Sequence, residues 1–202
     1  GTTGFLNSGS SLKYPVHFTG ERNVMLSGEA YFDVTHRMNP FIVHTPNLKI
    51  KVIGTQLDVI AYADDSNEEV ILNQGEVEIA MKDGISFEVL RPNHKFLLNS
   101  SKSTFRTIEV EAFQYIGWTE GKLIFRNENM QEMAKRLGRW YNVEIKIEDK
   151  ELLKYSFHAT FIDEGLEEVL KYMSTTTPFT YEELPRLTTS GNIVQKRVIL
   201  IK

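Results

Sequence analysis

The sequence has five histidines, whose side chains could bind a metal or transfer a proton. No two of them stand three or four residues apart, the spacing at which one helix or strand usually presents a ligand pair. Their positions favour surface or hydrogen-bonded imidazoles, above all for the strand-borne His44 and His158. The chain also has no cysteine, which excludes thiolate ligands and thiol catalysis. The five are His17, His36, His44, His94 and His158.

Acidic side chains gather at two places. Residues 64–69, Asp-Asp-Ser-Asn-Glu-Glu, faintly resemble a calcium loop, but they lack its glycine at position six, and its twelfth position is Gly75 instead of glutamate. We interpret this segment as a solvated hairpin turn. Glu76 and Glu78 share one face of a predicted strand, as exposed strand charges commonly do, so they do not by themselves indicate the carboxylate pair of a glycoside hydrolase.

Serine, glycine and aromatic motifs give no better indication of catalysis. Ser8-Gly9-Ser10 is not a nucleophile elbow, and the chain has no glycine-rich phosphate loop. Trp140-Tyr141 could stack on a sugar or a base, but both residues end an apolar helical stripe, so at least one of them should belong to a core. We therefore expect no catalytic residue, no metal and no cofactor, and we expect a protein that is not an enzyme.

Strands must position most of these side chains. From Val24 to Val110 apolar and polar residues alternate with period two, which predicts strands with one buried and one solvated face. Turn-forming residues interrupt the pattern at short intervals. Many short strands joined by short turns predict an all-β sandwich or roll. The turns are expected at 38–40, 64–67, 73–75, 82–84 and 91–93.

Beyond Trp118 the period changes to that of helices. Asn129 should cap a first helix, with Glu132 as its partner three residues later. Asp163 should cap a second helix, which Pro178 ends. Strands at 122–125, 143–147, 155–161, 179–182 and 198–201 complete a small α+β domain of order βαβ-βαββ. The helical stripes are Met130, Met133, Ala134, Leu137, Trp140 and Tyr141, then Leu166, Val169, Leu170 and Met173.

Length and charge limit the function further. The 202 residues suit one or two domains, and we expect two, at 1–114 (all-β) and 115–202 (α+β). A net charge of −4 argues against a nucleic-acid platform. No apolar run approaches the ~18–20 residues that span a bilayer. The abrupt start at Gly1 indicates a piece of a longer protein.

Several motifs, taken in their order along the chain, resemble the FecR family of transmembrane anti-sigma factors. Those of the second region resemble the C-terminal domain of FecR-like proteins from Bacteroides-type bacteria, which is similar to the short N-terminal module of secretins and TonB-dependent receptors. One departure is Asn93, where the family usually has glycine, although asparagine also tolerates a left-handed turn. The motifs are Gly1-Thr2, Leu6-Asn7, 10–15, 28–34, 40–43, 52–62, 72–79, 90–92, 121–125, 137–143 and 166–170.

The resemblance implies a periplasmic region of a single-pass inner-membrane protein. Its partner would be the N-terminal signalling extension of an outer-membrane TonB-dependent receptor, and a cytoplasmic segment absent from this chain would act on an extracytoplasmic-function sigma factor. It implies no nucleic-acid partner and no direct membrane contact by this region. The alternatives are a periplasmic carbohydrate-binding β module, or a module of a secretin or TonB-dependent receptor itself.

A partner strand could pair with an open sheet edge in the second domain. The run 196–202 is apolar with basic ends, as suits an edge strand protected by charge, so we place partner binding at Arg197, Val198 and Ile199. The other candidate is 155–161, with Phe157 and Ala159, although its alternate aromatic residues could instead face the core. Both runs could also be internal strands. Leu137 and Leu170, each mid-stripe, should be core residues.

Overall fold

The computed structural model describes residues 1–82, 87–184 and 196–202, and they form two compact units. Unit 1 is Gly1–Thr119 and unit 2 is Glu120–Lys202. The sequence placed the boundary after residue 114, which falls inside the short helix α1 (Ala112–Ile116). This helix and most of the 3-10 turn η1 (Gly117–Glu120) belong to unit 1.

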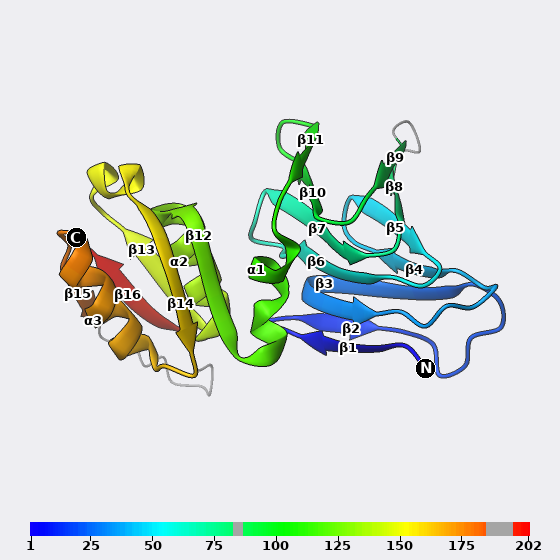
Figure 1. Ribbon diagram of the computed structural model, residues 1–202, viewed down its shortest axis with the longest axis horizontal. Coiled ribbons are helices and arrows are strands. Elements are labelled where there is room, and N and C mark those ends of the chain that lie inside the picture. The colour runs from blue at the N-terminus through cyan, green and yellow to red at the C-terminus, as the bar shows by residue number, and fades with distance from the viewer. Residues whose placement is uncertain (83–86, 185–195) are drawn as a thin grey trace, which may run out of the picture. The chain divides into compact units, whose positions relative to one another are not determined.

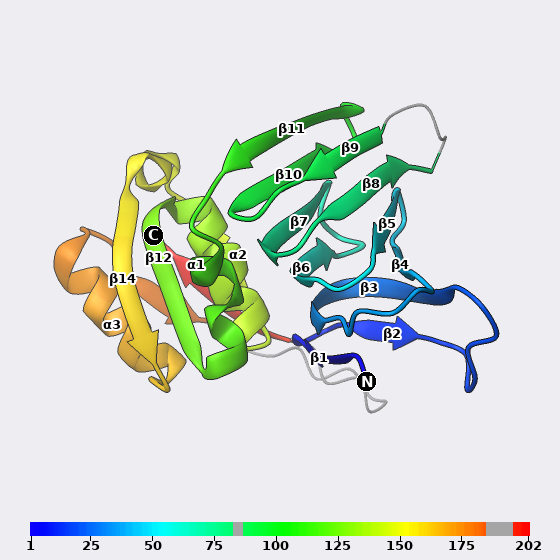
Figure 2. The ribbon, with the colours of Figure 1, turned by 45° about the vertical axis from the view of Figure 1, so that its right-hand side comes forward.

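Unit 1 is the all-β domain that the period-two pattern predicted (Figure 1). Its strands follow the order β11-β10-β7-β6-β3-β4-β5-β8-β9, and β1 and β2 also pair with β3. Figure 2 shows β8 to β11 on one side of the roll and β1 to β3 on the other. The strands are β1 (Thr3–Leu6), β2 (Ser11–Lys13), β3 (Arg22–Asp33), β4 (Phe41–His44), β5 (Leu48–Val52), β6 (Gln56–Ala61), β7 (Asn67–Gln74), β8 (Val77–Met81), β9 (Phe87–Leu90), β10 (His94–Asn99) and β11 (Thr104–Glu109).

The long strand β3 joins the two halves of the roll. Residues before Gly28 pair with β2 and β4, whereas Gly28 and those after it pair with β1 and β6. Gly28 has a φ of 105°, and a Cβ there would lie 2.6 Å from the Cα of Ser10. Glycine is therefore needed where the strand changes partners.

Apolar side chains from both halves fill the interior, as the alternation predicted. Leu57 and Val59 of β6 face it together with Val70 and Leu72 of β7. The expectation of a solvated second face is wrong for these two strands, however, because every residue from Leu57 to Ala61 is buried. Their outer face is covered by the segment 110–119, with Ile60, Ile71 and Ala112 in contact.

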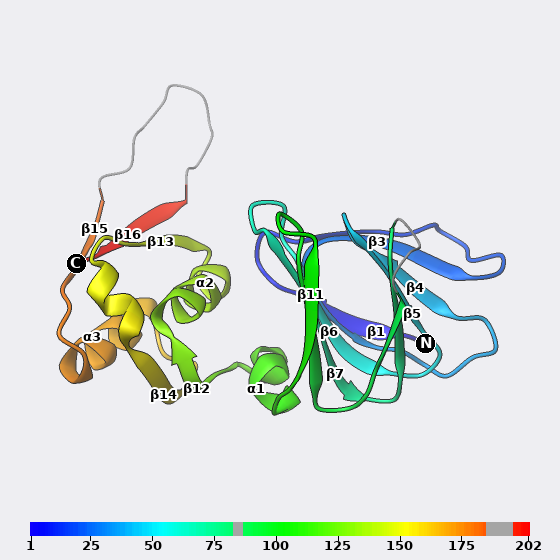
Figure 3. The same cartoon turned by 90° about the horizontal axis from the view of Figure 1, so that it is seen from above.

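Unit 2 has the predicted order of strands and helices. Figure 3 shows its two α-helices between the β12–β14 pair and the three-stranded sheet β13-β16-β15. One apolar core joins all layers, and Leu137 and Leu170 are both buried in it, as predicted. The elements are β12 (Lys122–Asn129), α2 (Met130–Trp140), β13 (Val143–Ile147), η2 (Lys150–Lys154), β14 (Ser156–Ile162), α3 (Leu166–Thr176), β15 (Tyr181–Glu183) and β16 (Arg197–Ile201).

The two helix starts differ from each other. The Asn129 side chain accepts a hydrogen bond from the Glu132 N–H at 3.0 Å, which confirms the predicted cap. Asp163 does not cap α3. The N-cap residue is Gly165, which has no side chain to accept a capping hydrogen bond. Asp163 has a φ of 63° and forms part of the turn that leaves β14. Glu167 and Glu168 lie in the first turn instead, where negative charge favours a helix start.

Two further predictions concern loops and membrane segments. The turn expected at 82–84 and the segment 184–195, whose polar, glycine-containing sequence predicts a hairpin loop, lie mostly outside the described residues. Among the residues that the structure describes, no helix is both long and apolar enough to cross a membrane.

Candidate functional site

The C-terminal run that the sequence placed at a sheet edge is a central strand. β16 pairs with β13 in parallel on one side and with β15 in antiparallel on the other, so the edge position expected for Arg197, Val198 and Ile199 is wrong. The basic ends have another role, because Arg197 pairs with Glu183 at 2.6 Å and Lys202 with Glu182 at 2.7 Å. These charges join neighbouring strands, and Ile199 is buried.

The second candidate strand does lie at an edge. β14 pairs with β12, and no other described strand pairs with it. Its Phe157 and Phe161 side chains are buried in the unit 2 core, and Ala159 packs partly against that core. The strand therefore offers its backbone and an outward row that includes His158 and the exposed Ile162.

The metal and acid–base candidates show no catalytic arrangement. No group of three His, Cys, Asp or Glu side chains that could hold a metal ion occurs within 1–82, 87–184 and 196–202. The His44 Nε2–H donates a hydrogen bond to Asn23 Oδ1 at 2.8 Å. Burial, with smaller contributions from Lys49 and Lys82, lowers the pKa of His44.

The acidic segment 64–69 is only partly a solvated turn. Asp64 is exposed, as expected, but Glu68 is buried and accepts hydrogen bonds from the Thr45 hydroxyl and from the backbone N–H and side-chain amide of Asn47. Glu69 is buried as well and pairs with Lys95 at 3.0 Å. These two carboxylates stabilise the fold of unit 1.

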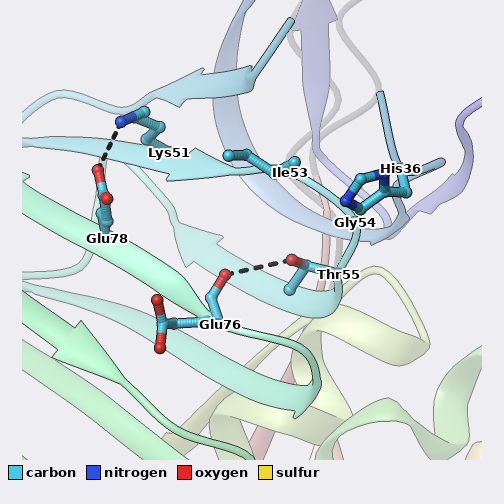
Figure 4. Close-up of a pocket in the computed structure, with 7 residues that line it drawn as sticks. All are labelled: His36, Lys51, Ile53, Gly54, Thr55, Glu76 and Glu78. Carbon is cyan, nitrogen blue, oxygen red and sulfur yellow. Dashed lines mark hydrogen bonds and ion pairs between the residues drawn. The ribbon is translucent and has the colours of Figure 1, made fainter. Parts of the chain in front are cut away.

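Glu76 and Glu78 line a shallow hollow of about 210 Å³ in unit 1 (Figure 4). The Glu78 carboxylate already pairs with Lys51 at 2.8 Å, and the Thr55 hydroxyl donates to the Glu76 carbonyl at 3.2 Å. With one carboxylate neutralised by lysine, the pair lacks the free acid and base that hydrolysis requires.

Trp140 and Tyr141 pack against the core of unit 2. The Tyr141 hydroxyl donates to the Glu164 carbonyl at 2.6 Å, and burial followed by the charge of Glu164 raises the pKa of Tyr141 to about 12. Their placement supports the core interpretation and not a ligand-stacking platform.

Sequence reasoning missed a group of buried acids on the outer face of the unit 1 sheet. This buried acid cluster consists of Glu29 of β3, Asp58 of β6 and Glu69 of β7. Asp58 is fully buried, and burial first, then the charge of the neighbouring Glu29, raises its pKa well above the ordinary range. Neither Asp58 oxygen has a hydrogen-bond partner of ordinary geometry, and the same holds for Trp118 Nε1. The Trp118 N–H nevertheless lowers the pKa of Asp58, so these atoms lie close together.

The segment that ends unit 1 lies over the buried acid cluster. Lys95 places its ammonium 4.7 Å from the centre of the Tyr115 ring, and the Trp118 ring meets Phe5 edge-on at 6.5 Å. Burial lowers the pKa of Lys95, but the nearby Glu69 and Tyr115 outweigh that effect and raise it. Asn93, in the expected left-handed conformation, accepts from the Ala112 N–H through its side chain at 3.4 Å.

Comparisons with known proteins agree with this two-unit organisation. The family described as FecR protein matches residues 1–78, and the family described as FecR, C-terminal matches residues 122–189. The chain belongs to the FecR family. The two matches leave 79–121 between them, so Glu29, Asp58 and Glu69 lie in the FecR match whereas Trp118 does not.

Two solved structures are similar to this chain over almost its whole length. A candidate anti-sigma factor from Parabacteroides distasonis ATCC 8503, solved at 1.65 Å resolution, is 28% identical with a TM-score of 0.82, covering 100% of this chain and 90% of that one. A second structure carrying the same description, at 2.50 Å, gives 28% identity and a TM-score of 0.80, with 99% and 90% coverage. No curated protein matches the chain.

Proposed function

We propose that this chain is the periplasmic, signal-receiving region of a single-pass inner-membrane anti-sigma factor. It receives the state of an outer-membrane TonB-dependent transducer and relays it to an extracytoplasmic-function sigma factor. The observation that carries the proposal is the match of both units to FecR families, together with full-length similarity to a candidate anti-sigma factor. The sigma factor is contacted by a cytoplasmic segment outside this chain, and the chain itself contacts neither nucleic acid nor membrane.

The role is binding and not catalysis. The acidic and aromatic side chains with catalytic potential are engaged structurally: Glu78 by Lys51, Glu69 by Lys95, and Tyr141 by a backbone carbonyl. A regulatory protein of this kind needs rigid modules with surfaces that a partner can occupy, and both units have extensive cores.

We place the partner contact at β14, around Phe157 and Ala159. An incoming strand from the receptor's N-terminal signalling extension can add to the strand edge opposite β12, because main-chain N–H and C=O groups at an edge accept a further strand. Ile162 is 54% exposed, which offers that strand an apolar side chain. β16 pairs with β13 on one side and β15 on the other, so a partner strand cannot add at Arg197, Val198 and Ile199 without displacing one of them.

The experiment is capture followed by a binding measurement. The immobilised chain is exposed to an outer-membrane extract of the source bacterium, and bound proteins are identified by mass spectrometry. We expect a TonB-dependent receptor with an N-terminal extension. Capture that is equally efficient for receptors without the extension would contradict the proposal.

A matched pair of variants then locates the contact. Ile162→Lys places a charge at the β14 edge, and Val89→Lys places one at an exposed site of β9. The purified extension should bind the Ile162→Lys chain at least tenfold more weakly than wild type and the Val89→Lys chain normally. Equal affinities would exclude β14 as the contact while leaving the receptor as partner.

A further inference from the structure

A small pocket of unit 1, where β3 and β4 begin side by side, is lined by two arginines that pair with no carboxylate of the described residues. Arg22 and Phe41 are register partners in this parallel pair. The pocket measures about 210 Å³ and lies between the loop before β3 and the loop before β4. Its lining is Phe18, Gly20, Arg22, Arg37, Met38 and Asn39.

Arg22 is a buried cation whose hydrogen bonds all go to neutral oxygens. Its Nε donates to the Asn39 carbonyl at 3.1 Å, its Nη1 to the Thr2 hydroxyl at 3.0 Å, and its Nη2 to the Thr35 carbonyl at 3.3 Å. A guanidinium has five N–H donors, so one on each terminal nitrogen remains for an acceptor. A carboxylate binds such a pair of N–H groups with both oxygens.

Arg37 adds a second positive charge to the pocket. It is exposed, and no described acidic residue within 1–82, 87–184 and 196–202 forms an ion pair with Arg22 or Arg37. Burial first, then the charge of Arg37, lowers the pKa of Arg22, and no acid opposes that effect. Uncompensated buried charge is costly, and an anionic partner would offset that cost.

Exposed apolar side chains surround the two cations. Met38 is 97% exposed and Phe18 is 43% exposed, and Val16 on the same loop as Phe18 is 90% exposed. The walls are tied together, because the Asn39 side chain donates to the Gly20 carbonyl at 2.9 Å and the Arg22 N–H donates to the Pro40 carbonyl at 2.9 Å. The pocket is thus a preformed cationic hollow with an apolar rim.

We propose that this pocket binds an acidic peptide segment of a partner protein, taking one Asp or Glu carboxylate between Arg22 and Arg37 and a neighbouring apolar side chain against Phe18 and Met38. The charge of the pocket selects the carboxylate, and the rim distinguishes a peptide from a free organic acid. This site belongs to unit 1 whereas β14 belongs to unit 2, and the proposal does not depend on the identity of the receptor.

The test titrates three probes into the intact chain. Binding is measured by NMR from the arginine Nε–H and methionine methyl signals. The probes are acetyl-Leu-Glu-Leu-amide, the same peptide with Gln in place of Glu, and sodium acetate. We expect the Glu peptide to shift the signals of Arg37 and Met38 and to bind at least tenfold more tightly than the Gln peptide. Acetate should shift only the arginine signals, at higher concentration.

Variants separate the pocket from general charge effects. Arg37→Gln should weaken binding of the Glu peptide at least fivefold. Met38→Ser should weaken binding of the Glu peptide but not binding of acetate. Arg106→Gln is the matched control, since this exposed arginine lies on β11, separated from β3 by β10, β7 and β6. Equal binding of the Glu and Gln peptides, equal loss in Arg106→Gln, or acetate binding as tight as the Glu peptide would each overturn the proposal.

Discussion

Buried polar side chains distinguish the two units. Unit 1 buries charged groups on the outer face of its sheet, among them Glu29, Asp58 and Glu69, whereas the only polar side chain among the buried residues described in unit 2 is that of Thr177. A buried charge is costly unless it is paired or protonated, so unit 1 should respond to pH and to the loss of single partners. Unit 2 should respond mainly to loss of apolar volume.

The chain offers a separate probe for each unit. Trp118 lies in unit 1 and Trp140 in unit 2, and these are the two tryptophans of the sequence. 5-Fluorotryptophan labelling therefore gives one ¹⁹F resonance per unit in the same sample. The free energy of unfolding of each unit can be followed separately in urea.

The largest effect is expected from breaking the buried ion pair. Lys95→Met leaves Glu69 without its ammonium partner beside Asp58, and loss of one member of a buried pair costs about 3–5 kcal/mol. The Trp118 resonance should report this loss and the Trp140 resonance should not. The double variant Lys95→Met, Glu69→Leu should recover most of the stability, and a double variant as unstable as the single one would contradict the charge argument.

Truncation of core side chains in unit 2 should change the Trp140 resonance and leave that of Trp118 unaffected. Leu137→Ala and Leu170→Ala each remove a fully buried side chain from unit 2 and should cost about 2–5 kcal/mol, reported by Trp140 alone. Leu153→Ala, at an exposed site in the same unit, is the control and should change little. Unchanged urea midpoints for both core variants would refute their place in the core.

The pH dependence should belong to unit 1 through Asp58. Because its folded-state pKa is raised, its contribution to stability is complete below the unfolded value of about 4 and is lost as pH rises through the folded pKa. Asp58→Asn should stabilise unit 1 at pH 8 by about 1–3 kcal/mol and flatten its stability profile above pH 5. Asp64→Asn, at an exposed position, should leave that profile as it is. If the stability of unit 1 in the Asp58→Asn variant still falls steeply above pH 5, a group other than Asp58 causes the pH dependence.

The smallest effect concerns the helix cap of unit 2. Asn129→Ala removes the acceptor for the Glu132 N–H and should cost about 1 kcal/mol, seen at Trp140. Asp163→Gly should not cost a comparable amount, because Asp163 does not cap α3 and glycine adopts its φ of 63° without strain. Equal losses in the two variants would show that the caps were assigned wrongly.

Periodicity predicted unit 2 well because its helices bury one stripe each. The stripe from Met130 to Leu137 and the Asn129 cap follow from local spacing alone. The position of β16 could not be predicted this way, since its parallel pairing with β13 joins residues far apart in the sequence. The charges of Arg197 and Lys202 suit an edge strand and a cross-strand ion pair equally, and the structure shows the pair.

In unit 1 the pattern predicted strands but not the second buried face. Alternation predicted strands with one buried face, and Leu57 and Val59 lie on that face. The sequence did offer a signal for the outer face, because Asp58 is the only charged residue in the otherwise apolar run 57–61. A solvated strand face normally carries more polar side chains than this run provides. Which segment covers that face depends on the docking of 110–119, a tertiary event that no local period encodes.

The most direct test of the proposed function is made in the source bacterium with the full-length protein. Transcription from a promoter of the cognate sigma factor is measured with and without the ligand of the captured TonB-dependent receptor, in wild type and after removal of the region corresponding to residues 1–202. We predict that the removal abolishes the response to the ligand and leaves sigma-factor activity fixed at one level. A response of wild-type size in its absence would contradict the signal-receiving role.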